Sequence, residues 1–176
     1  KVYDFIWDEF CDWYIELAKY RIWHAEEDPK AANAALWTLK TVLANGLKML
    51  HPFMPFVSEE IYSALVPEEE SLMMSKWPEF KAEWNFATEE LQVERMKEII
   101  RGVRNVRAEM NVAPSRKAGV FVVCENEVLC NGFAEMKTSA APLMSASEIV
   151  IQKTKEGIEE DAVSVVVTDA VVYLPL

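Results

Sequence analysis

The sequence is poor in the residues that most often carry catalysis or metal binding. It has only two histidines, His24 and His51, which lie far apart and suit helix-end or packing roles. Its five glycines form no phosphate-binding loop. The three cysteines, Cys11, Cys124 and Cys130, show no close pair and no metal-ligand spacing, which indicates buried reduced thiols. We therefore expect no catalytic residue, no metal and no cofactor within these 176 residues.

Long apolar runs and positive charge are also scarce. No run approaches the roughly 20 residues of a transmembrane helix, and no signal peptide is recognisable, so we expect a cytoplasmic protein without a membrane partner. There are 18 Lys and Arg residues against 29 Asp and Glu, which gives a net charge of −11. Because Lys and Arg carry phosphate binding, this balance alone argues against nucleic acid and leaves room only for a narrow, salt-sensitive basic surface.

Apolar residues, which make up 51% of the chain, are arranged in two successive patterns. Helical spacing predicts long helices over 3–23, 32–50 and 88–110, and a short one over 58–65 after a proline bend at 51–56. We expect Trp77 and Trp84 to cover the end of this bundle. After Pro114 the spacing predicts a helix over 126–136 and strands over 120–123, 148–151, 163–167 and 171–174. The predicted class is α+β, with a helical bundle at 1–113 and a small α/β subdomain at 114–176.

The stretch IIRGVRNVRAEMNVAPSRK, residues 99–117, joins the two patterns. Its apolar residues form one helical stripe, and Pro114 is expected to stop the helix. Beside the stripe lie several polar side chains: Arg101, Arg104, Asn105 and Arg107, followed by Arg116 and Lys117. Two interpretations stay open from the residues alone, a core helix with solvated arginines and a ridge that faces phosphates.

Two segments resemble the valyl-tRNA synthetase family. WDEFCDWYIELAK, residues 7–19, looks like the first helix of its anticodon-binding domain, and IRGVRNVRAEMNVAPSRK, residues 100–117, looks like its last helix. HPFMPFVSEEIY, residues 51–62, is similar to a bend found more widely in the Val/Ile/Leu/Met group of class I synthetases. VVYLPL, residues 171–176, is similar to the last strand of the family. The resemblance thus covers nearly the whole chain.

The resemblance implies an ATP-dependent valine–tRNA ligase as the parent protein. Lys1 in place of an initiator Met and the apolar end VVYLPL both suggest a fragment of a longer chain. Catalytic and editing domains, the former using ATP and valine, would then precede Lys1, and a helical arm would follow Leu176. The fragment itself would bind tRNA(Val), not DNA, and would catalyse nothing.

The resemblance also implies roles for particular residues. Trp13 would stack on an anticodon base, and Lys19 and Arg21 would contact phosphates or base edges. Contacts along the anticodon stem would come from the basic stretch, namely Arg101, Arg104, Asn105, Arg107, Arg116 and Lys117. The alternatives are a core role for Trp13, cations stabilising a helix end, and pairing with the abundant carboxylates. Arg107 lies nearest the buried stripe and is the foremost candidate for a structural role.

Other functions stay open at this point. Isoleucyl-type synthetases share the trio Asp12-Trp13-Tyr14 but not the arginine helix in this form. A helical module that binds protein partners through its acidic faces would suit the net charge of −11. An enzyme acting alone is the least supported, because the chain lacks the residues that ATP–pyrophosphate exchange requires.

Overall fold

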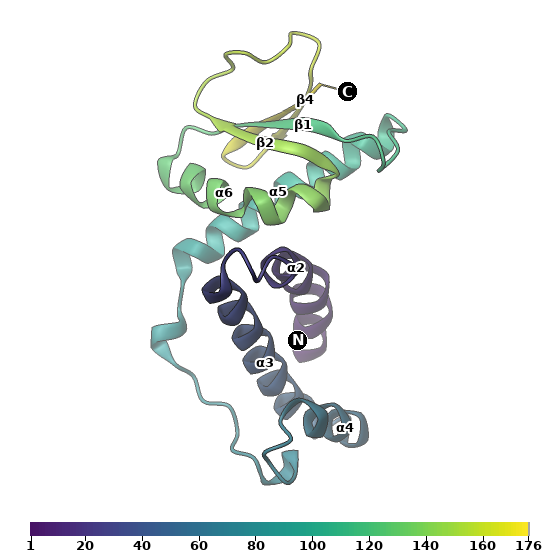
Figure 1. Cartoon of the computed structure of the whole chain (residues 1–176), viewed down its shortest axis with the longest axis vertical. Helices are drawn as coiled ribbons and strands as arrows, with labels where there is room; N and C mark the ends of the chain where they lie inside the picture. Colours follow the sequence, from purple (N-terminus) through teal and green to yellow (C-terminus); the bar gives the residue numbers. More distant parts are fainter. Residues whose placement is uncertain (176) are drawn as a thin grey trace. The chain divides into compact units, whose positions relative to one another are not determined.

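The computed structural model describes residues 1–175, which form two compact units divided between Ala82 and Glu83. The first unit is helical, and the second contains two helices and a sheet (Figure 1). The predicted α+β class, with a helical part followed by a small sheet, is confirmed. Leu176, the final residue of the family-like end VVYLPL, lies outside the described residues.

The first unit consists of three helical segments and a short turn. The first helix runs continuously through α1 (Val2–Asp4), the π-helical segment η1 (Phe5–Ile15) and α2 (Glu16–Trp23). Then come α3 (Pro29–Leu50), α4 (Pro55–Leu65) and the 3₁₀ turn η2 (Leu72–Met74). Helix α3 packs against both the first helix and α4. At the contact between α3 and the first helix, a Cβ built at Gly46 would lie 3.2 Å from Ile6 Cδ1, so the Ile6 side chain would have to shift slightly to accept it.

The predicted proline bend between α3 and α4 is tied by polar contacts. The buried Ser58 hydroxyl donates to the Met54 carbonyl at 2.7 Å and lies 2.8 Å from His51 Nδ1. A core cluster joins α3, α4 and η2: Leu47, Tyr62, Val66 and Leu72. Trp77 is 61% exposed, so the expectation that it covers the bundle end is wrong. For Trp84, which is 42% exposed and belongs to the second unit, that role stays a prediction.

Within the described residues, the second unit contains a four-stranded sheet with helices on one face. The strand order is β2-β1-β4-β3, with β1 and β2 parallel and the other pairs antiparallel. The strands are β1 (Ala118–Val123), β2 (Ala146–Gln152), β3 (Val163–Val167) and β4 (Ala170–Leu174). Helix α6 (Glu127–Ala140) and the 3₁₀ turn η4 (Ala141–Met144) connect β1 to β2, and α5 (Ala87–Glu109) lies beside α6 (Figure 1). A short 3₁₀ turn, η3 (Ala82–Trp84), precedes α5.

Helix α5 packs directly on the sheet. A Cβ built at Gly102 would lie 2.9 Å from Val165 Cγ1 on β3, closer than real Cβ atoms come. Ile99, Ile100 and Val103 are fully buried on the same helix. The compact units therefore divide near residue 82, whereas the sequence predicts a division at 113, where helix gives way to strand. As a limit of the family domain, residue 113 stays a prediction.

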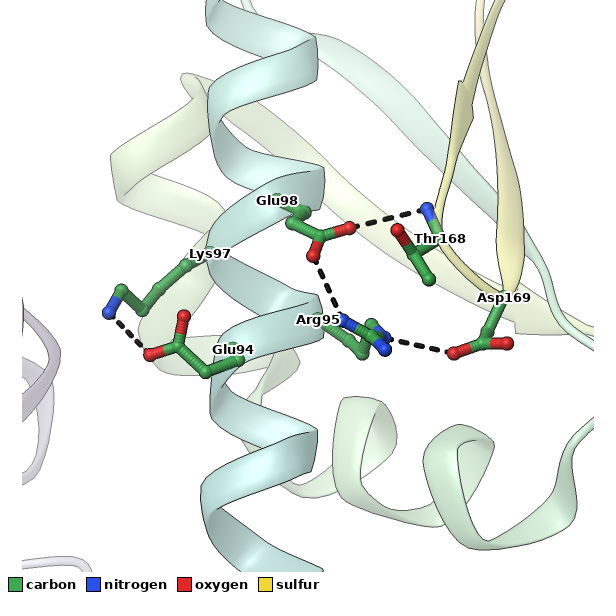
Figure 2. A network of polar contacts seen from close by, with 6 residues as sticks. All are labelled: Glu94, Arg95, Lys97, Glu98, Thr168 and Asp169. Carbon is green, nitrogen blue, oxygen red and sulfur yellow. Dashed lines mark hydrogen bonds and ion pairs between the residues drawn. The ribbon is translucent and has the colours of Figure 1, made fainter.

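A polar network fixes α5 to the turn between β3 and β4 (Figure 2). Arg95 donates from Nε to Asp169 at 2.9 Å and from Nη1 to Glu98 at 3.0 Å. Glu98 in turn accepts the Thr168 backbone N–H at 3.2 Å. Asp169 has a φ of 64°, so this turn depends on a left-handed residue that the network restrains. The network thus holds the predicted hairpin turn against α5.

The Glu98 carboxylate gives the second unit a specific pH dependence. Hydrogen bonds from Thr168 and the Arg95 guanidinium hold the pKa of Glu98 below its ordinary value of 4.5. A depressed pKa contributes stability above the unfolded-state pKa and loses it as the pH falls through the folded-state value. We expect the free energy of unfolding of wild type to fall by a few tenths to about 1 kcal/mol more than that of Glu98→Gln between pH 6 and pH 3, measured by urea unfolding. Identical losses in the two proteins would contradict this role.

Candidate nucleic-acid interface

The first helix carries exposed aromatic rings, and we call this set, with its cations, the first-helix surface: Tyr3, Trp7, Trp13, Lys19, Arg21 and Trp23. Tyr3 and Trp7 are 60% and 58% exposed, and their rings stack with centroids 6.3 Å apart and planes 4° apart. Trp13 is half-buried. The segment η1 is π-helical, a rare geometry that is frequently found at functional sites. Flat apolar faces are therefore available to a ligand.

The end of the first helix combines an indole with cations. Trp23 is 74% exposed, and Lys19 Nζ lies 6.0 Å from the centre of its ring. Lys19 also forms an ion pair with Glu16, with Nζ 2.5 Å from Oε1, so the carboxylate partly neutralises its charge. Arg21 is exposed. His24 closes the helix, with Nδ1 2.9 Å from the Tyr20 carbonyl and the two rings 4.1 Å apart.

Sequence reasoning named Trp13, Lys19 and Arg21 from this helix but not Trp7 or Trp23. The apolar spacing that predicts this helix defines one face, and Trp7 lies outside that face, whose residues are Tyr3, Ile6, Phe10, Trp13, Tyr14 and Leu17. An aromatic residue off the buried stripe should be exposed, and that signal was sufficient to find Trp7. Trp23 lies at the end of the helix, where the spacing of apolar residues does not indicate whether a side chain is buried or exposed.

The second unit carries what we call the arginine surface, formed by the exposed residues Arg101, Arg104, Asn105, Arg116 and Lys117. Arg104 donates from Nε to the Leu143 carbonyl of η4 at 2.7 Å, which fixes the direction of its side chain. The stretch 99–117 has five cations and one carboxylate, Glu109, in a chain of net charge −11. This surface is therefore a local concentration of positive charge.

Helix α5 ends before the proline that was expected to stop it. The helix ends at Glu109, because Asn111 adopts a left-handed φ of 53°. The Val112 N–H then donates to the Arg107 carbonyl at 2.8 Å, and the Asn111 N–H donates to the Ala108 carbonyl at 3.1 Å. This pair of bonds is the Schellman motif, which satisfies carbonyls left open at a helix end. The expectation that Pro114 ends the helix is wrong.

Arg107 differs from the other predicted cations because it is only 6% exposed. Its Nη2 donates to the Ala113 carbonyl at 3.0 Å and also to the Arg116 carbonyl. The Arg116 N–H donates to the same Ala113 carbonyl at 3.0 Å, which closes a turn over residues 113–116. The guanidinium of Arg107 is thus engaged within the chain, while the side chains of Arg116 and Lys117 are exposed.

The described part of the chain contains neither a metal-binding cluster nor a helix suited to cross a membrane. Across residues 1–175, no group of three or more His, Cys, Asp or Glu side chains is arranged to hold a metal ion. In the same residues, no helix is both long and apolar enough to cross a membrane.

Exposed aromatic rings beside cations, and a separate row of guanidinium groups, are the side chains that RNA-binding proteins use for bases and phosphates. Residues 1–122 match the family model described as the anticodon-binding domain of tRNA ligase, and the chain therefore belongs to this family.

Three relatives are valine–tRNA ligases of bacteria. Identity is 44% over 176 residues with Clostridium tetani, 43% over 179 with Clostridium perfringens and 35% over 175 with Bacillus cereus. The matches cover 99–100% of this chain and 20% of each relative, so the chain spans about a fifth of their length. The predicted family resemblance is confirmed.

Proposed function

We propose that the chain is the anticodon-binding part of a valine–tRNA ligase and that it binds tRNA(Val). The observation that carries this proposal is the family match over residues 1–122 together with whole-chain similarity to valine–tRNA ligases. Other domains of the same protein would activate valine with ATP and transfer it to the tRNA, in cytoplasmic protein synthesis. Catalytic and editing domains would precede this part, and a helical arm would follow it. No catalytic or cofactor-binding residue is assigned here.

The first-helix surface is proposed to bind the anticodon loop. Anticodon bases are unpaired and can stack on aromatic rings, each stack contributing roughly 1–3 kcal/mol. Trp13 is the predicted stacking residue, and the exposure of Trp7 and Trp23 adds two further candidates. Lys19 and Arg21 would contact phosphates or base edges.

The arginine surface is proposed to contact the backbone of the anticodon stem. Its cations, with the amide of Asn105, lie in the most basic stretch of an acidic chain. Such contacts supply affinity without reading sequence, so they should be equally important for every tRNA. The isoleucyl-type and protein-interaction alternatives are less well supported, since the relatives described above are valine–tRNA ligases.

A titration at two salt concentrations tests the proposed function. The 176-residue chain should bind tRNA(Val) at about 50 mM salt and lose affinity at about 200 mM, because counterions released from the phosphates drive part of the binding. Fluorescence anisotropy with labelled tRNA measures both affinities. No binding at low salt would exclude an RNA role for this chain.

Replacing the proposed stacking residue should reduce discrimination rather than general binding. We expect Trp13→Ala to narrow the affinity gap between tRNA(Val) and a non-cognate tRNA, with a loss for tRNA(Val) of about 5- to 150-fold. Trp77→Ala, which removes an exposed indole in the loop after α4, is the matched control and should change neither affinity. If circular dichroism shows that Trp13→Ala merely unfolds the protein, Trp13 is a core residue and the stacking role is contradicted.

A further inference from the structure

We propose that Arg107 is a positioning residue, which holds the 113–117 segment so that Arg116 and Lys117 face an RNA phosphate. Sequence position alone would make Arg107 one more phosphate contact or a packing residue. The inference rests on the proposed function, because it assigns the ligand of the arginine surface. It adds a role for a side chain that is itself shielded from RNA by burial.

The segment after α5 is held by one residue at two points. The backbone carbonyl of Arg107 accepts the Val112 N–H at 2.8 Å, which fixes the start of the segment. The side chain of Arg107 donates to the carbonyls of Ala113 and Arg116, which fixes its end. The hydrogen bonds that hold the 113–116 turn therefore either come from Arg107 or share the Ala113 carbonyl with it.

Arginine suits this position for a geometric reason. The guanidinium is a planar fork of several N–H donors, so it can bridge two carbonyls, whereas a lysine ammonium is a compact point charge on a flexible stem. Among residues 1–175 no ion pair between Arg107 and a carboxylate is present, so carbonyl dipoles stabilise the group and its positive charge is not cancelled. Arg107 therefore adds to the positive potential at Arg116 and Lys117 as well as fixing their backbone.

A fixed backbone lowers the entropic cost of binding. Pro114 occupies the second position of the 113–116 turn, where its restricted φ favours the turn. With the turn held, Arg116 and Lys117 leave the surface from defined positions just before β1 begins at Ala118. Without the hydrogen bonds of the Arg107 guanidinium, the backbone that carries Arg116 and Lys117 would adopt a broader set of conformations. RNA binding would then have to restrict that set, at an entropic cost.

A double-mutant cycle on the 176-residue chain separates positioning from direct contact. The variants are Arg107→Lys, which keeps the charge, the pair Arg116→Ala/Lys117→Ala, and all three changes together. Each is titrated with a tRNA(Val) transcript at several salt concentrations. We expect Arg107→Lys to weaken binding about three- to ten-fold in the wild-type background. In the Arg116→Ala/Lys117→Ala background it should change affinity less than two-fold, because the residues through which it acts are gone.

Pro114→Gly is a second variant for the case in which Arg107→Lys unfolds. It loosens the same turn without touching a buried group and should weaken binding in the same non-additive way. Losses that add in full would show that Arg107 does not act through Arg116 and Lys117, and would overturn the inference. The inference would also be overturned if wild type binds tRNA and Arg107→Lys binds it equally well. The same holds if Arg116→Ala/Lys117→Ala binds as tightly as wild type. Absence of tRNA binding by wild type would overturn the proposed function and this inference with it.

Discussion

Replacing Arg101, Arg104, Arg116 and Lys117 together by Gln should lower affinity for every tRNA by about 100-fold or more at low salt. This corresponds to about 0.7 kcal/mol per lost contact, a modest value for exposed charge-assisted bonds. Each phosphate contact removed should also reduce the slope of log affinity against log salt by about 1, so the combined change is about 4. Cognate and non-cognate tRNAs should be weakened alike, since backbone contacts do not read sequence.

A charge-matched variant controls for the net charge of the protein. Replacing Lys30, Lys76, Lys137 and Lys153 by Gln removes the same four positive charges from exposed positions elsewhere. When the two variants are compared at about 0.1 M salt, the control should lower affinity by less than about three-fold, because long-range charge effects are screened within about 10 Å at that ionic strength. Equal losses in the two variants would mean that net charge, not the arginine surface, determines binding.

Gly102→Leu should destabilise the second unit by about 2–3 kcal/mol, which lowers its melting temperature by about 10 °C or more. The new side chain would have to occupy the space of Val165, whose Cγ1 lies 2.9 Å from the position of a Cβ at residue 102. The better helix propensity of Leu offsets less than about 1 kcal/mol of this cost. Hydrogen exchange at the amides of β3 and β4 would report the loss within the second unit.

A compensating substitution identifies the cause of this loss. Gly102→Ala should be milder, and Gly102→Ala combined with Val165→Ala should recover part of the stability beyond the sum of the two single changes. The reason is that Val165→Ala removes the methyl groups that the new Cβ would meet. Strict additivity of the two changes would mean that α5 does not pack on β3 at this point.

Local patterns in the sequence predicted most of the fold. The strands over 163–167 and 171–174 and the turn at Thr168-Asp169 agree with β3, β4 and the turn held by Arg95 and Glu98. Periodicity depends only on neighbouring residues, so it located these elements well. It could not show that Gly102 allows α5 to approach Val165, or that α5 groups with the sheet. Those facts depend on residues about 60 positions apart.

The candidate site was predictable in composition but not in detail. Arg101, Arg104, Arg116 and Lys117 are exposed, as the proposed contact with phosphates requires. The helix end at Asn111 and the bonds of Arg107 to Ala113 and Arg116 could not be read from spacing, because a left-handed residue reverses the chain there. The exposure of Trp77 could not be predicted, because apolar composition does not determine burial outside a periodic element.

The most direct measurement compares tRNA(Val) with the same tRNA in which only the anticodon bases are exchanged. The two molecules present the same phosphates, so any difference in affinity for the 176-residue chain comes from base recognition. The chain is proposed to stack at least one anticodon base and to contact its edges. We therefore expect its affinity for the exchanged tRNA to be lower by about ten-fold or more. Equal affinity for the two tRNAs would contradict anticodon recognition by this chain.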